Sequence, residues 1–210
     1  DGFQRRWIEC SKCQCCTNLM KPDNARLLNK LGEGYYEVDF ANSNILEKFD
    51  KVMALPADKS DNAQRVQRVS DFLTLWLSEM SINSRNISLL DIGAGTGVFL
   101  TKFLQAHRNE TIRKFNAVAL EPDATAAEHL RSIGGFKVIE SSFDPDKIGA
   151  NFTLITMNKI IEHVAAPSQL LHDVRKVLNP ISGLIYAQVP DAATIGRRSP
   201  EDNILGSLHH

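Results

Sequence analysis

The chain has 210 residues, 43% of them hydrophobic and 23% charged, which suits one full domain or one domain with an appendage. Its net charge of -1 does not indicate a basic surface that would attract nucleic acid or an anionic membrane. No apolar run approaches the roughly 18 residues of a membrane span, and there is no charged-then-apolar secretory leader. A cytoplasmic protein that does not bind nucleic acid is therefore expected.

All four cysteines lie near the start of the chain, at Cys10, Cys13, Cys15 and Cys16. A cytosolic protein seldom uses such a cluster for disulfides. Two thiolates spaced C-x-x-C can reach one metal, so Cys10 and Cys13 are candidate zinc ligands. Structural zinc takes four ligands, and the adjacent Cys15 and Cys16 are poorly placed to complete a tetrahedron. A second C-x-x-C pair would be needed; the alternative is an exposed cysteine run without metal.

Residues 21–60 show no clear period, whereas apolar segments alternate regularly from residue 62 onward. An amphipathic helix is predicted over 62–80, with an inward stripe formed by Val66, Val69, Phe72, Leu73, Trp76 and Met80. The strands that follow are expected at 87–92, 115–121, 136–141, 152–158 and 183–189. Helices are expected between them at 96–107, 124–133 and 166–178. This alternation predicts an α/β fold with a doubly wound, mostly parallel sheet.

The segment 89–100, Leu-Leu-Asp-Ile-Gly-Ala-Gly-Thr-Gly-Val-Phe-Leu, predicts a buried strand, a glycine-rich turn and the start of a helix. Glu121 ends the next strand, and this order builds a nucleoside-binding crevice. The glycines follow G-x-G-x-G, with Val98 where the dinucleotide fingerprint has its third glycine. No basic residue lies between Asp91 and Phe99 to meet a pyrophosphate. A ribose-containing ligand without phosphates fits better.

The segment at 89–100 resembles motif I of class I S-adenosylmethionine-dependent methyltransferases. The resemblance continues in order through residues 117–122, 152–164 and 178–190, and it covers roughly residues 62–191. Two departures stand out: Thr153 occupies a position where the family usually has Asp, and the turn at 178–183 has one extra residue.

This resemblance implies S-adenosylmethionine as cofactor and assigns the residues around it. Glu121 would take the ribose hydroxyls, since a carboxylate accepts two hydrogen bonds and donates none. Ser142 and Phe143 follow the third strand, where the adenine usually sits. The full set of expected cofactor-binding residues is Asp91, Gly93, Ala94, Gly95, Gly97, Glu121, Pro122, Ser142, Phe143 and Asn158.

The same resemblance bears on domain organisation. The family usually has seven strands, so the chain is expected to be truncated after strand five, which would leave the sheet edge near Val189 uncovered. The cysteines resemble the zinc module that precedes the methyltransferase domain in sugar C-methyltransferases, although only Cys10 and Cys13 can be matched. We therefore expect an N-terminal segment at 1–60 with a partial zinc module, and a methyltransferase domain at 61–210.

Two pairs of residues, each with at least one histidine, are candidates for removing a proton from the acceptor, because an acceptor that must lose a proton needs a general base. Glu162 and His163 follow strand four at the carboxyl edge of the sheet; the alternative is a structural or cofactor-side role. His209 and His210 lie where sugar methyltransferases carry a histidine-rich segment over the acceptor, or they are a tag remnant or tail. Tyr35 and Tyr36 could cover the site or simply pack. No role is assigned to His107, His129 and His172, which are expected on helix surfaces.

The sequence thus predicts a methyltransferase acting on a small-molecule acceptor, such as a sugar, a nucleotide-sugar or a glycan intermediate. Two alternatives remain. One is a non-catalytic module of the same fold that keeps cofactor binding. The other is a nicotinamide-dependent oxidoreductase, against which Val98 argues.

Overall fold

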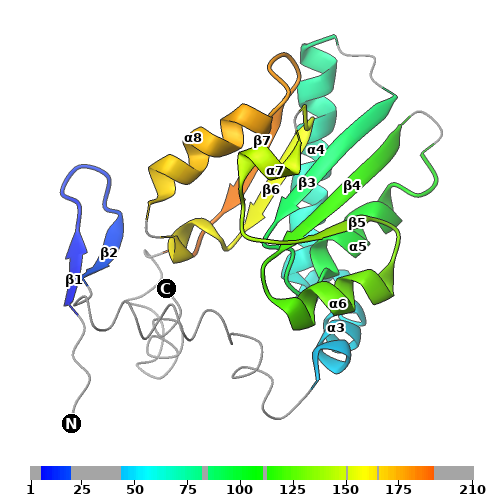
Figure 1. Cartoon of the computed structure of the whole chain (residues 1–210), viewed down its shortest axis with the longest axis horizontal. Helices are drawn as coiled ribbons and strands as arrows, with labels where there is room; N and C mark the ends of the chain where they lie inside the picture. The colour runs from blue at the N-terminus through cyan, green and yellow to red at the C-terminus, as the bar shows by residue number, and fades with distance from the viewer. Residues whose placement is uncertain are drawn as a thin grey trace.

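The computed structural model describes residues 6–19, 44–81, 85–110, 113–149, 151–164 and 166–191. Its centre is a five-stranded parallel sheet with strand order β5-β4-β3-β6-β7 (Figure 1). The strands are β3 (Asn86–Ile92), β4 (Lys114–Glu121), β5 (Lys137–Glu140), β6 (Leu154–Asn158) and β7 (Leu184–Gln188). The predicted strands are confirmed to within two residues. Because β3 pairs with β4 on one side and β6 on the other, the strand order reverses beside β3, where such sheets bind ligands.

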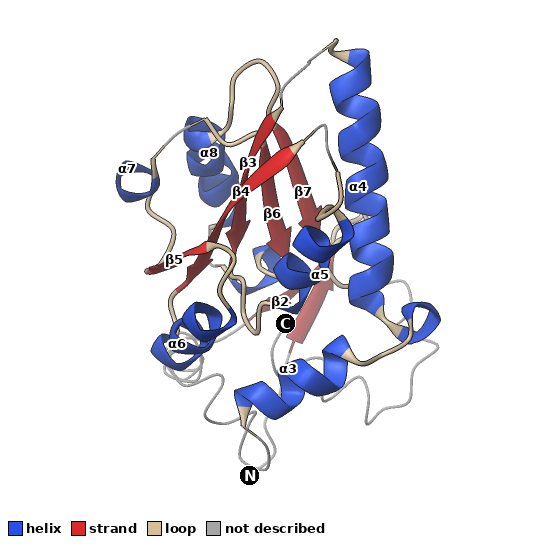
Figure 2. Cartoon of the chain, turned by 90° about the vertical axis from the view of Figure 1, so that its right-hand side faces the viewer, coloured by secondary structure: helices blue, strands red, loops and turns tan. Residues whose placement is uncertain are grey.

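Helices cover both faces of the sheet (Figure 2). On one face α4 (Asp61–Glu79), α5 (Val98–Ala106) and α6 (Ala124–Ile133) contribute to a core with Leu89 and Leu154. On the other face α7 (Pro145–Ile148) and α8 (Pro167–Val177) pack over Leu90 and Ile155. Neighbouring strand residues therefore point to opposite cores, which explains the consecutive apolar residues in the middle of these strands. The predicted doubly wound α/β architecture is confirmed.

Two expectations about helices need correction. The helix after the glycine turn begins at Val98 rather than residue 96, because Gly97 takes a φ of +77° and forms its N-cap. Phe72 and Met80, expected on the inward stripe of α4, are exposed, whereas Leu77 is buried. Phe72 instead lines a groove of about 520 Å³ between α4 and β7, together with Leu75 and Tyr186. Of the described strands, β7 lies at the sheet edge beside this groove.

Several short elements were not predicted. The helix α3 (Ile45–Met53) is capped by Asn44, whose side-chain oxygen accepts from the Glu47 backbone N–H at 2.8 Å. The Glu47 carboxylate accepts in return from the Asn44 side chain. The spacing Asn-x-x-Glu, which resembles that of a capping box, was the available sequence signal. The remaining additions are the short helix α7, the 3₁₀ turns Ala57–Lys59 and Ile161–His163, and the strands β1 (Arg6–Glu9) and β2 (Cys16–Leu19).

The helix α3 packs against α5 and α6, and Lys102 of α5 donates a 3.0 Å hydrogen bond to the Met53 carbonyl. Residues before 60 thus contact the sheet domain, while the domain boundary expected there stays a prediction. Within the described ranges, no helix is both long and apolar enough to cross a membrane.

Candidate active site

The carboxyl ends of the parallel strands bring most of the expected site residues to one edge of the sheet (Figure 1). Asp91 lies near the end of β3 and is followed by the glycine turn, Glu121 ends β4, and Asn158 ends β6. Pro122 follows Glu121, while Ser142 and Phe143 follow β5. The short 3₁₀ turn with Glu162 and His163 comes after β6 at the same edge.

The glycine turn folds tightly against the neighbouring strand. The backbone N–H groups of Gly93 and Ala94 donate to the Leu120 carbonyl at 2.8 and 3.1 Å. Gly93 has a φ of +68°, and a Cβ there would collide with the Ile160 side chain. Gly97 has a φ of +77°, and its Cβ would lie 2.6 Å from Leu130 Cδ2. Both positions require glycine for conformation and for space.

Glu121 is fixed by the backbone around it. Its Oε2 accepts from the Gly95 N–H at 2.8 Å, and its Oε1 accepts from the Asp123 N–H at 3.0 Å. Burial raises the pKa of Glu121, and these two hydrogen bonds counter the rise. A carboxylate has about four lone-pair sites, so two acceptor positions remain after the backbone bonds. The group can therefore accept two further hydrogen bonds from a ligand.

Asp91 is a fully buried carboxylate between β3 and β6. Its Oδ1 accepts from Thr156 Oγ1 at 2.6 Å and from Asn158 Nδ2 at 3.3 Å. Burial raises the pKa of Asp91 to about 7, against the lowering effect of these two hydrogen bonds and of the Arg65 charge. Asn158 contributes a second acceptor, because its Oδ1 is buried and makes no hydrogen bond with any described residue. The site thus offers two adjacent acceptors beside the glycine turn.

The other residues expected at the site differ in how deeply they are buried. Burial raises the pKa of Glu162, while the nearby Lys159 charge lowers it. His163 and Ser142 are exposed. Phe143 is half-buried and packs against the apolar core beneath α7 and α8. His209, His210, Tyr35 and Tyr36 lie outside the described residues.

Sequence reasoning missed Arg65, a buried arginine in the first turns of α4. Its Nε donates to Gln188 Oε1 at the end of β7, and its Nη1 donates to Asn62 Oδ1 at 2.7 Å. Burial lowers the pKa of Arg65, while Asp91 is among the carboxylates whose charge raises it. The sequence signal for its burial was its spacing from Val69. Arg65 lies four residues before this buried valine and therefore occupies the inward stripe of the helix.

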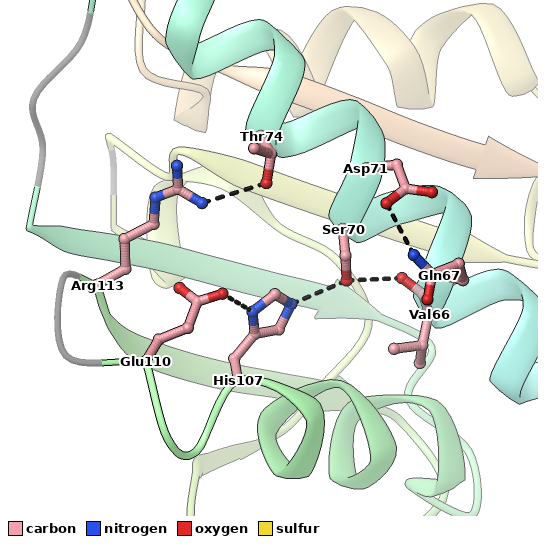
Figure 3. Close-up of polar contacts among 8 residues, drawn as sticks. All are labelled: Val66, Gln67, Ser70, Asp71, Thr74, His107, Glu110 and Arg113. Atoms are coloured by element: carbon pink, nitrogen blue, oxygen red, sulfur yellow. Dashed lines mark hydrogen bonds and ion pairs between the residues drawn. The ribbon is translucent and has the colours of Figure 1, made fainter.

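Two histidines expected on helix surfaces are buried instead. His129 packs edge-on against Phe49 of α3, with ring centroids 5.2 Å apart. His107 lies between α4 and the loop after α5 (Figure 3), with Nδ1 2.6 Å from Glu110 Oε1 and Nε2 2.8 Å from Ser70 Oγ. Both corrections have one cause: a neighbouring helix covers the side of the helix that the sequence suggests is free.

The connection Ser70–His107–Glu110 has the order of a hydrolase triad but not its chemistry. In a triad the imidazole accepts the serine proton, whereas the Ser70 hydroxyl donates to the Val66 carbonyl at 2.7 Å (Figure 3). The group also lies near the start of β4, at the edge opposite Asp91 and Glu121. It is best explained as a polar clamp between α4 and the α5–β4 loop.

Cys10, Cys13 and Cys15 lie in the turn of the β1–β2 hairpin, and Cys16 begins β2. Cys10, Cys13 and Cys15 are exposed thiols and Cys16 is half-buried. The backbone N–H groups of Cys13 and Lys12 lower the pKa of the Cys10 thiol, which favours the thiolate form that binds metals. Among the described residues, no three Cys, His, Asp or Glu side chains cluster as a metal site. The described residues therefore do not assemble the four ligands that structural zinc requires, and zinc binding by Cys10 and Cys13 stays a prediction.

Comparison with known proteins identifies the fold and the family. A family model described as a methyltransferase domain matches residues 62–206. The plantazolicin methyltransferase BpumL, in complex with a triazolic desmethylPZN analog and SAH, is 13% identical, with 90% of this chain and 71% of that chain covered and a TM-score of 0.58. Its complex with a monoazolic analog and SAH is 13% identical, covers 89% and 70%, and has a TM-score of 0.59. No protein of curated function matches the chain in sequence. The chain belongs to the methyltransferase-domain family, and its fold is that of a class I S-adenosylmethionine-dependent methyltransferase.

Proposed function

We propose that this protein transfers the methyl group of S-adenosylmethionine to a small-molecule acceptor in the cytoplasm. The observation that carries the proposal is Glu121, whose carboxylate is anchored by Gly95 and Asp123 yet keeps two acceptor positions. Two adjacent acceptors match the two hydroxyls of a ribose. The solved BpumL complexes, which contain SAH, support the same cofactor for this fold.

The cofactor would supply an electrophilic methyl group on a sulfonium, and the protein's task would be to align donor and acceptor and to exclude water. Glu121 would hold the ribose. The glycine turn would lie against the ligand, and Gly93 would keep the turn packed on Ile160, since a Cβ there would collide with that side chain. Asp91 and the Asn158 Oδ1 would accept hydrogen bonds from the ammonium of the methionine part.

Glu162 and His163 are our candidates for handling the acceptor proton. Their turn begins at Ile161, three residues after Asn158 ends β6. Burial raises the pKa of Glu162, which strengthens a carboxylate as a base near neutral pH. If this assignment holds, His163→Gln and Glu162→Gln will lower turnover while leaving SAH affinity unchanged. Weakened SAH affinity in both variants would indicate a cofactor-side role instead.

The sugar, nucleotide-sugar or glycan acceptor remains a proposal linked to the cysteine hairpin. Cys10 and Cys13 would supply half of a zinc site, and two further ligands must come from outside the described residues. Mass spectrometry of the intact protein under native conditions tests this: one zinc per chain, lost in Cys10→Ser, is expected. A metal-free wild-type protein would refute the zinc site and would remove the support for a sugar acceptor.

The proposed function is tested by calorimetric titration of S-adenosylhomocysteine. Wild-type protein should bind it with micromolar affinity, and Glu121→Gln should weaken binding by about 10- to 100-fold, as expected for a hydrogen-bonded charged group. Glu140→Gln is the matched control, because Glu140 ends the neighbouring strand but is exposed and pairs with Arg131 at 2.8 Å. NAD should not bind. Folded wild-type protein that binds NAD rather than S-adenosylhomocysteine would favour the oxidoreductase, and cofactor binding without methylation across an acceptor screen would favour the non-catalytic module.

A further inference from the structure

His129 is a buried imidazole that contacts both the glycine turn and α3. The residue is 6% exposed, and its ring packs edge-on against Phe49 of α3. A hydrogen bond joins the ring to the backbone of Thr96, which lies within the glycine turn. Leu130, the next residue of α6, lies against Gly97 of the same turn. Two consecutive residues of α6 therefore support the turn, and one of them also holds α3.

The helix α3 lies against α5 as well. Lys102, in the second turn of α5, donates to the Met53 carbonyl at the end of α3, and α3 packs against both α5 and α6 (Figure 2). Since α5 begins at Val98, directly after the glycine turn, α3 rests on the two helices that contact this turn. A displaced α3 would remove support from both helices at the edge where the cofactor is proposed to bind.

The polar surroundings of His129 favour a neutral imidazole. Among the described residues the Thr96 backbone is the hydrogen-bond partner of the ring, and the ring Nε2 is buried without a partner. A neutral imidazole has one N–H and an imidazolium has two, so protonation would add a buried donor that these surroundings do not satisfy. Burial also lowers the pKa of His129, against the raising effects of the Thr96 hydrogen bond and the Asp50 charge.

The charged groups around His129 do not compensate an imidazolium. Charged side chains on the elements packed around the ring are Glu47, Lys48, Asp50 and Lys51 of α3, Lys102 of α5, and Asp123, Glu128 and Arg131 of α6 and its N-cap. Of these, Asp50 is the carboxylate whose charge raises the pKa of His129. Within the described part of the chain, no carboxylate lies within ion-pair distance of the ring. A proton on His129 would therefore be poorly accommodated while α3 is docked.

We propose that His129 is a positioning residue of the cofactor site, whose neutral ring holds Thr96 of the glycine turn and Phe49 of α3 together. Protonation of the ring would release α3 and loosen the turn, so that cofactor binding weakens in mildly acidic solution. A released histidine titrates near pH 6.5, so each pH unit below that value favours undocking by at most about tenfold. This inference rests on the proposed function and adds a residue that acts through the glycine turn.

The test measures the Kd of S-adenosylhomocysteine by calorimetry at pH 7.5 and pH 5.5 in wild type and in His129→Gln. Glutamine keeps an N–H donor for Thr96 but does not titrate. The rise in Kd toward pH 5.5 should be about 3- to 10-fold larger in the wild type. Asp91 and Glu121 are present in both proteins, so their titration cancels in this comparison. His172→Gln makes the same substitution on the exposed surface of α8 and should keep the wild-type pH profile.

A second variant approaches the contact from α3. Phe49→Ala removes the ring that covers His129, so it should weaken binding at pH 7.5 and show a smaller rise in Kd toward pH 5.5 than the wild type. Parallel pH profiles of wild type and folded His129→Gln would overturn the role of His129; if His129→Gln does not fold, a wild-type profile in Phe49→Ala would do so. Either result leaves the proposed function standing, provided that Glu121→Gln weakens binding at pH 7.5. Failure of the wild-type protein to bind at pH 7.5 would overturn both.

Discussion

The buried carboxylate of Asp91 leads to a quantitative prediction about folding. Burial raises the pKa of Asp91 from 3.8 to about 7 in the folded chain. Between these values the folded state binds a proton that the unfolded state has released, so stability falls as pH rises. The slope is at most about 1.4 kcal/mol per pH unit and halves at the folded pKa, which gives roughly 2 kcal/mol between pH 5 and pH 7. The remaining loss, a few tenths of a kcal/mol, is complete about one pH unit above the folded pKa.

Asp91→Asn removes this titration while keeping the local hydrogen bonds. The amide oxygen of the new residue can accept from Thr156 and Asn158 as the carboxylate Oδ1 does. The free energy of unfolding of Asp91→Asn minus that of the wild type should therefore increase by about 2 kcal/mol from pH 5 to pH 7 and level off near pH 8. Urea unfolding at pH 5, 6, 7 and 8, followed by circular dichroism, measures this difference. The variant should be the more stable protein at pH 8 while binding S-adenosylhomocysteine less tightly.

Two controls make the test specific. Glu140→Gln removes an exposed carboxylate at the end of the neighbouring strand and serves as the comparison for Asp91→Asn. Thr156→Val removes the 2.6 Å hydrogen bond that lowers the pKa of Asp91, so the wild-type decline should extend to higher pH in that variant. Unfolding curves of wild type and Asp91→Asn that run parallel from pH 5 to pH 8 would refute the reasoning.

Two further predictions concern the glycine turn and the polar clamp. Gly93→Ala should lower the free energy of unfolding by about 1–3 kcal/mol, because alanine is strained at a φ of +68° and its Cβ meets Ile160. Thermal unfolding measures this, and the combination with Ile160→Ala should recover part of the loss; no recovery would contradict the steric explanation. His107→Leu should cost about 1–3 kcal/mol by leaving Ser70 and Glu110 without their partner. S-adenosylhomocysteine affinity should be unchanged in His107→Leu, since the clamp lies at the opposite edge, and a weakened affinity would contradict that placement.

The sheet and the glycine turn were predictable because both are encoded locally. Each central strand is buried on two faces, as Leu89 and Leu90 show by entering different cores, and this produces a continuous apolar run. The turn needs glycine at Gly93 and Gly97 for backbone and space, so the sequence carries a visible spacing. Glu121 was found because it immediately follows such a run.

The faces of the helices were less predictable, because they depend on what packs beside them. Phe72 belongs to the apolar pattern of α4 but lines the groove next to β7. His107 has a polar side chain on a short helix end, yet Ser70 of α4 and Glu110 enclose it. In each case the deciding neighbour is an element whose position no local pattern specifies.

The polar residues near the proposed site also differ in whether the sequence alone could place them. Asp91, Glu121 and Asn158 lie in or at the end of their strands, so the strand pattern alone places them at one edge of the sheet. Arg65 and Gln188 are 123 residues apart and meet only because α4 packs beside β7. In isolation Arg65 reads as a charged residue of an amphipathic helix, and only its contact with Gln188 shows that it is buried beside the end of β7. The strand ends can therefore be assigned from sequence, whereas a buried polar side chain contributed by α4 becomes recognisable once the sheet order has placed β7 next to β6.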